Sequence, residues 1–177
     1  MARLANPAGT GMGPVTFRAG FRVVNHNWEP WLQTVLPVLL PVLSKAVALS
    51  GSHLGRELVE LDQNALRDLP KSMRDASARA GRLLLKQGVP PGAKALQKLT
   101  VAVAKGDAPG HLATVFGARC GIFSIGTRAA ALAYVFQELA LGATDWTDIQ
   151  IASRLEEARV VVENMQAPNN DWLESHG

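Results

Sequence analysis

The chain has 177 residues, of which 47% are hydrophobic and 19% charged, and these values exclude a disordered or fibrous protein. Its single cysteine, Cys120, excludes an internal disulfide, and an aromatic content of only 6% favours helices over strands. The net charge of +3 is unevenly distributed, because residues 1–105 carry 14 Lys and Arg against 6 Asp and Glu, whereas residues 106–177 carry 4 against 9.

The N-terminal segment, residues 1–14, is rich in Gly, Pro and Ala, which predicts a flexible arm. Its GTGMG run lacks the preceding strand and the following Lys-Ser/Thr of a phosphate loop. No apolar segment of signal-peptide length is present, so we expect a cytoplasmic protein. The predicted organisation continues with one all-α domain over residues 15–165 and a polar C-terminal tail over residues 166–177.

The first predicted helix spans residues 28–49 and contains LPVLLPVL at 36–43, with Asn27 as its N-cap and Gly51 as its stop. The prolines exclude a central strand. They predict either a new helix that begins at Pro37 or a longer helix from Trp28 that bends around them. The apolar run has at most 13 residues, shorter than the roughly 20 that a membrane span needs. We therefore expect no membrane association.

Two amphipathic helices are predicted next, over residues 53–67 and 71–87. The expected apolar stripes consist of Leu54, Leu58, Leu61 and Ala65 in the first helix, and of Met73, Ala76, Ala80, Leu83 and Leu84 in the second. The opposite side of the second helix is basic, with Lys71, Arg74, Arg79, Arg82 and Lys86. Such a stripe is either a solvated face or a docking face for an acidic partner or phosphate. Nucleic-acid binding is left open, although no aromatic residues lie among the basic ones.

The C-terminal half predicts a short helix over residues 92–105, two apolar core helices over 111–123 and 128–141, and a last helix over 148–165. Asp107 is the expected cap of the first core helix, and its small residues, Gly117 and Gly121 among them, would let another helix approach closely. Thr147 and Gln150 form a capping box for the last helix, whose expected apolar positions include Ile149 and Val162. The fold class is therefore an all-α single-domain bundle of six or seven helices with two apolar central helices.

No catalytic, cofactor-binding or metal-binding motif is evident. The chain has no G-x-S-x-G sequence, and its four histidines lack the three or four convergent ligands of a zinc site. Cys120 lies in an apolar stretch and is expected to be a buried thiol. His111 opens a core helix beside a Gly-containing turn, where it is either a half-buried structural residue or a contact residue. We therefore expect no enzyme.

Several motifs, taken in order, resemble the UreF family of urease accessory proteins over roughly residues 36–160. LVELDQNAL resembles the family's L-x-x-LD-x-x-L stretch, and an R-x-x-S-x-x-x-G-x-x-L-L pattern follows at Arg74, Ser77, Gly81 and Leu84-Leu85. HLATVFG, AALAYVF and LGATDWTDIQ resemble the family's later helices and its LGQTDGQ segment. The family's N-terminal signature is absent, and the chain is shortened between AYVFQEL and LGATDW.

The resemblance implies a helical, non-catalytic protein that pairs with a UreD/UreH-type partner and recruits a UreG-type GTPase during nickel delivery to urease. It also implies dimers of heterodimers, so a homo-oligomer is expected. The tail is a candidate partner anchor, because buried Trp contacts tend to dominate interfaces. The expected partner-binding residues are Arg74, Arg79, Arg82, Lys86, His111, Tyr134, Trp172 and Leu173.

Two other functions are compatible with these observations. One is a helical structural subunit of a larger assembly, such as a phage or ribonucleoprotein particle, which would use the arm and the basic stripe; nucleic-acid binding with a steep salt dependence would identify it. The other is a small helical enzyme with a pocket between helices 111–123 and 128–141.

Overall fold

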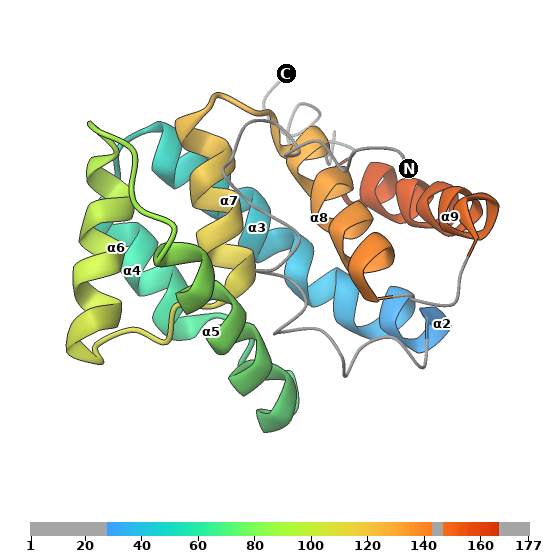
Figure 1. Cartoon of the computed structure of the whole chain (residues 1–177), viewed down its shortest axis with the longest axis horizontal. Helices are drawn as coiled ribbons and strands as arrows, with labels where there is room; N and C mark the ends of the chain where they lie inside the picture. The colour runs from blue at the N-terminus through green and yellow to red at the C-terminus, as the bar shows by residue number, and fades with distance from the viewer. Residues whose placement is uncertain (1–27, 143–146, 167–177) are drawn as a thin grey trace, which may run out of the picture.

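The computed structural model describes residues 28–142 and 147–166, and this part of the chain contains seven α-helices and no strand (Figure 1). The all-α prediction is therefore confirmed, with helix ends within a few residues of those expected. The N-cap Asn27, the N-terminal arm and the C-terminal tail lie outside the described residues. The helices are α3 (Leu36–Gly51), α4 (Gly55–Asn64), α5 (Lys71–Leu85), α6 (Lys94–Lys105), α7 (Leu112–Ile122), α8 (Thr127–Gly142) and α9 (Asp148–Gln166).

The proline-containing segment is one continuous helix rather than a helix that begins at Pro37. A short helical turn, α2 (Trp28–Pro30), and a π turn, η2 (Trp31–Val35), lead directly into α3. The Leu36 N–H donates to the Trp31 carbonyl, a bond one residue longer than in an α-helix. Pro37 has no N–H for the carbonyl four residues back, and its ring would crowd that carbonyl. The wider turn just before Pro37 relieves this conflict.

The helix from Trp28 to Gly51 has 24 residues and a mean hydropathy of 1.7, so by length and composition alone it could cross a membrane. The sequence argument against a span considered only the apolar run, and the helix that contains this run is longer. A core helix of a soluble protein has the same composition. Here one face of α3 is buried against other helices, including Leu36, Leu40 and Leu43.

Helices α3 and α7 form the central pair of the bundle (Figure 1). Every residue of α7 from Leu112 to Gly121 is buried. Gly117 and Gly121 face α3 so closely that a Cβ atom would lie 2.5 Å from the Leu43 carbonyl oxygen and 2.3 Å from that of Val47. The prediction that small residues admit a neighbouring helix is confirmed. The helix that approaches along α7 is α3, whereas α8 packs mainly on α3 and α9.

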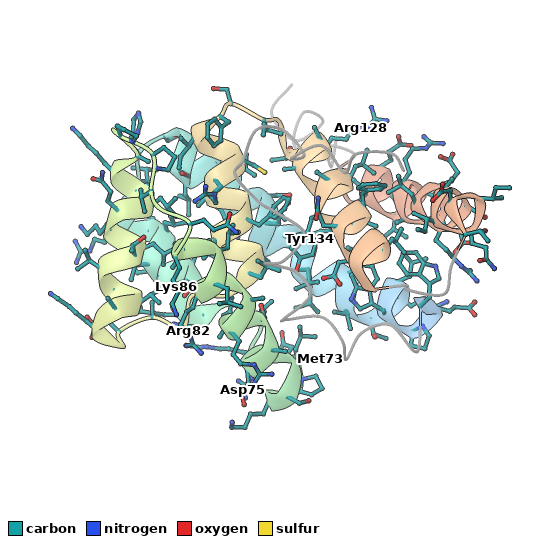
Figure 2. The ribbon with its side chains drawn as sticks, in the orientation of Figure 1. Met73, Asp75, Arg82, Lys86, Arg128 and Tyr134 are labelled. Carbon is teal, nitrogen blue, oxygen red and sulfur yellow. The ribbon has the colours of Figure 1, made fainter. Side chains whose placement is uncertain are left out.

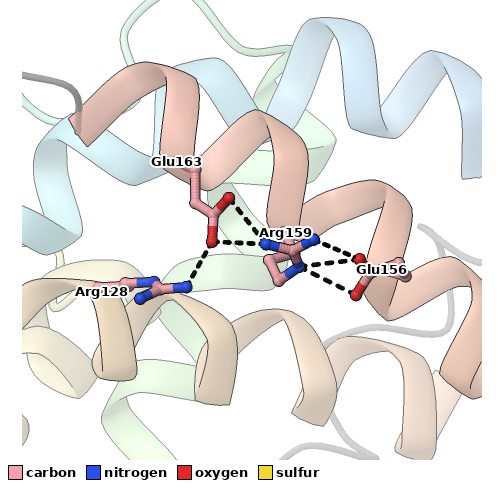
Figure 3. A network of polar contacts seen from close by, with 4 residues as sticks. All are labelled: Arg128, Glu156, Arg159 and Glu163. Atoms are coloured by element: carbon pink, nitrogen blue, oxygen red, sulfur yellow. Dashed lines mark hydrogen bonds and ion pairs between the residues drawn. The ribbon is translucent and has the colours of Figure 1, made fainter.

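The remaining helices flank this pair on two sides (Figure 1). On one side α4 packs on α6, and α5 packs on α7; on the other, α8 packs on α9. Arg128 of α8 forms an ion pair with Glu163 of α9, and Arg159 bridges Glu163 at 2.8 Å and Glu156 on the same helix (Figure 3). These pairs are largely exposed and therefore add little stability.

The last helix begins as its capping box predicts, since the Gln150 N–H donates to Thr147 Oγ1 at 3.3 Å and the Thr147 N–H donates to Gln150 Oε1 at 2.8 Å. Some residues expected in apolar stripes are instead exposed, among them Leu54 (43%), Leu83 (36%) and Ile149 (82%). Leu54 precedes α4 rather than lying within it, and Ile149 lies in the first turn of α9.

Candidate functional site

The N-terminus of α7 is buried and is capped by side chains from two other helices. Asp62 of α4, which is fully buried, accepts hydrogen bonds from the Gly110 N–H at 2.6 Å and the His111 N–H at 2.8 Å. Ser77 Oγ of α5 accepts from the Leu112 N–H at 3.1 Å. Residues distant in sequence thus satisfy the His111 and Leu112 N–H groups at this helix end.

The prediction that Asp107 caps this helix is therefore wrong. The helix begins at Leu112, five residues after Asp107, and its N-cap residue His111 provides no capping side chain. Asp107 instead lies exposed in the preceding turn, where its backbone carbonyl accepts a hydrogen bond from Gln63 Nε2 at 2.8 Å. A local cap is unnecessary because Asp62 reaches the same donors from α4.

Burial sets the protonation of the two titratable groups at this junction. Desolvation raises the pKa of Asp62, although the N–H donors and His111 act in the opposite direction. Desolvation also lowers the pKa of His111, against the attraction of Asp62, so the imidazole is neutral at neutral pH. Its Nδ1 atom is buried and has no hydrogen-bond partner among the described residues.

Gly81 allows α5 to touch the start of α7. A Cβ atom at this position would lie 2.0 Å from the Gly110 carbonyl oxygen and 2.9 Å from both the His111 carbonyl carbon and the Leu112 nitrogen. All three are backbone atoms, which cannot move aside independently. Glycine is therefore required at this helix crossing, and it brings Ser77, one turn earlier on α5, within reach of the α7 N-terminus.

A pocket of about 530 Å³ lies beside this junction. Arg82 of α5 donates to the Pro109 carbonyl at 3.3 Å and so holds the pocket wall to the turn before α7. Figure 2 shows Arg82 and Asp75 on one side of α5 and Met73 on the other. The lining residues are Gln63, Ala65, Arg67, Arg74, Asp75, Ala78, Arg79, Arg82, Pro109 and His111.

The pocket is strongly positive. Asp75, its one acidic lining residue, is bound by Lys71 at 2.6 Å, and that hydrogen bond lowers the pKa of Asp75. None of the four lining arginines forms an ion pair with a carboxylate of the described residues. Four arginines therefore line the pocket beside a single carboxylate that Lys71 already binds, an arrangement typical of anion recognition.

The predicted site residues fall into four groups. Arg74, Arg79, Arg82 and His111 are brought together at the pocket. Lys86, also exposed, follows α5 and does not line the pocket. Trp172 and Leu173 lie outside the described residues.

Tyr134, the remaining predicted contact residue, is in the core rather than on the surface. It is only 1% exposed and packs edge-to-face on Phe116, with ring centroids 5.3 Å apart. This ring contact joins α8 to α7. The motif position of Tyr134 is therefore a core position in the fold. Cys120 is buried as expected, and burial raises the pKa of its thiol to about 12, so it is no nucleophile at neutral pH.

The sequence analysis assigned no buried role to several polar residues, among them Asp62, Ser77 and Glu138. Each lies at a position of its helix where the periodicity demands an apolar side chain. Asp62 continues the stripe of Leu58 and Leu61, and Glu138 follows Tyr134 by one turn. A polar residue within an apolar stripe could have revealed these positions from the sequence. A polar side chain is buried at low cost only when it has hydrogen-bond partners.

Glu138 is the most perturbed of these groups. It is 3% exposed and interacts with the Tyr134 hydroxyl, and desolvation raises its pKa well above the ordinary value. The folded protein therefore holds this proton more tightly than the unfolded chain. The contribution of Glu138 to stability falls as the pH rises from the unfolded pKa near 4.5 towards the folded pKa.

Glu138→Gln is accordingly expected to become increasingly stabilising, relative to the wild type, between pH 5 and pH 8. Glutamine resembles the neutral acid and does not ionise, so the gain approaches about 1.4 kcal/mol per pH unit below the folded pKa. Urea unfolding at each pH measures it. Glu57→Gln, at an exposed position on α4, is the control. A constant difference for Glu138→Gln would contradict the buried neutral acid.

Comparison with known proteins gives one family. A model of the UreF family matches residues 28–141, which is more than half of the chain. No curated protein and no solved structure matches. Three of the motifs that carried the resemblance supply Asp62, Ser77, Gly81 and His111, and the fold brings all four to the junction of α4, α5 and α7.

Proposed function

The chain belongs to the UreF family of urease accessory proteins, and we propose that it is a non-catalytic scaffold for nickel delivery to urease. In this role it binds a UreD/UreH-type partner and recruits a UreG-type GTPase. Nickel is the cargo of the assembly and not a resident cofactor of this chain. Family membership favours this function over a structural subunit of a phage or ribonucleoprotein particle.

The observation that supports this proposal is the α5 basic face, which consists of Arg74, Arg79, Arg82 and Lys86. Arg79, Arg82 and Lys86 are exposed, and none of the four residues forms an ion pair among the described residues. A positive face of this kind attracts an acidic protein surface and accelerates its association. We propose that the α5 basic face docks an acidic surface of one of the two partners.

The proposal includes three further features, which concern location, oligomeric state and the C-terminal tail. We expect a cytoplasmic protein that forms dimers, in line with dimers of heterodimers. We also expect Trp172 and Leu173 to form a second partner contact, as predicted from the sequence. No catalytic residue is assigned, since the UreF family is a family of accessory chaperones.

Reversing charges on the α5 basic face tests the docking proposal. The double variant Arg79→Glu/Lys86→Glu is expected to weaken binding of the UreG-type GTPase or the UreD/UreH-type partner at least tenfold at low salt. The loss should shrink as salt rises, because screening weakens surface electrostatics. Surface-immobilised binding of each purified partner to the full chain measures both effects.

Lys94→Glu/Lys98→Glu is the matched control, since it reverses two exposed charges on α6, away from the α5 basic face. This control should leave both partner affinities within twofold of the wild type. Unchanged binding of both partners to Arg79→Glu/Lys86→Glu would contradict docking through α5. Equal weakening by both double variants would also contradict it, by showing a response to net charge alone.

A further inference from the structure

The pocket between α4, α5 and the start of α7 has features that protein docking on an exposed helix face does not require. It is concave, and its volume of about 530 Å³ lies within the range of small-molecule sites. Four arginines line it, while its single acidic residue, Asp75, is held by Lys71. The pocket therefore combines a space of ligand size with four arginines in its lining.

A buried histidine forms part of the same wall. His111 is 5% exposed, lines the pocket, and has an Nδ1 atom without a partner among the described residues. The backbone of His111 is fixed by Asp62, so the ring is held at this wall before any ligand arrives.

We propose that this pocket binds a phosphate group of a small molecule, held by Arg74, Arg79 and Arg82, with the His111 ring in the adjoining wall. Several guanidinium groups on one wall exceed what the two oxygens of a carboxylate can accept. The oxygens of a phosphate can accept from several arginines at once, and its double charge matches the unpaired arginines better. The site therefore fits phosphate better than a single acidic side chain.

The phosphate site does not depend on the proposed scaffold function, because the isolated chain contains all of its residues. It shares Arg74, Arg79 and Arg82 with the α5 basic face, so a bound phosphate would compete with a docked partner. The two proposals fail separately: phosphate binding is measured without partners, and the docking variants are measured without phosphate.

Calorimetric titration of the full chain with inorganic phosphate tests the site. We expect saturable binding, and at least a tenfold weaker affinity for Arg74→Gln/Arg79→Gln. Lys94→Gln/Lys98→Gln removes two charges from α6 and should change the affinity less than twofold. The single variant Arg79→Gln, at an exposed position, is a second measure if the double variant unfolds, with an expected loss of at least threefold. AMP in place of phosphate shows whether a larger phosphate ester fills the pocket better.

The nitrogen chemical shifts of the His111 ring provide a local readout that does not depend on the net charge of the protein. Phosphate should shift them, whereas chloride at the same ionic strength should not. Non-saturable binding, equal weakening by the arginine and lysine variants, or an unshifted His111 ring would each overturn the proposal. So would a glutamate-rich peptide that binds through the same arginines while phosphate does not, because the pocket would then be a protein-docking site.

Discussion

Gly81→Ala is expected to lower the free energy of unfolding by about 2 kcal/mol or more. The new Cβ atom would lie 2.0 Å from the Gly110 carbonyl oxygen, so α5 and the start of α7 must separate. Overpacking of this kind typically costs about 1–3 kcal/mol and more when the obstacle is backbone. The higher helix propensity of alanine returns only about 1 kcal/mol. Urea unfolding of the purified variant measures the net loss.

Gly51→Ala is the control for this substitution. Gly51 is also a helical glycine, but its Cβ atom would lie 3.7 Å from the Gly121 carbonyl oxygen, which is ordinary van der Waals contact. This variant should be neutral or slightly more stable than the wild type. If Gly81→Ala were as stable as Gly51→Ala, the close crossing of α5 over the α7 N-terminus would be wrong.

The helices were predictable from the sequence because they depend on local signals. The apolar period of α5, the Gly and Pro residues that follow it, and the capping box of α9 each act within a few residues. The close approach at Gly117 was also predictable, since small residues in an apolar helix admit a neighbour. The identity of that neighbour was not, because the choice between α3 and α8 depends on tertiary packing.

The candidate site was predictable only in part, for the same physical reason. Arg74, Arg79 and Arg82 share one face of a helix, which spacing alone reveals. The cap of α7 joins Asp62 to Gly110 and His111 across 48 and 49 residues, and nothing near α7 indicates it. Asp107 has a residue type and position that local rules favour for an N-cap. The buried Asp62 carboxylate of α4 accepts the hydrogen bonds instead. The pocket is formed by this long-range contact, so its walls could not be assembled from local patterns.

Asp62→Ala is expected to destabilise the fold by about 3 kcal/mol. The substitution leaves the N–H groups of Gly110 and His111 buried without acceptors, and each such loss costs about 1–3 kcal/mol. The cost of burying the carboxylate, reflected in the raised pKa of Asp62, is recovered and offsets part of this loss. Asp62→Asn keeps one acceptor oxygen and should lose about half as much. Urea unfolding gives both values.

Amide hydrogen exchange separates loss of the cap from general destabilisation. In Asp62→Ala the amides of Gly110 and His111 should exchange faster by a larger factor than core amides of α3, because only they lose their acceptor. Asp68→Ala, at an exposed position, should stay within about 0.5 kcal/mol of the wild type and leave these amides unchanged. Uniform acceleration of all amides in Asp62→Ala would mean that the carboxylate supports the fold without capping α7. The wall that carries His111 would then need another explanation, since Asp62 holds the His111 backbone in place.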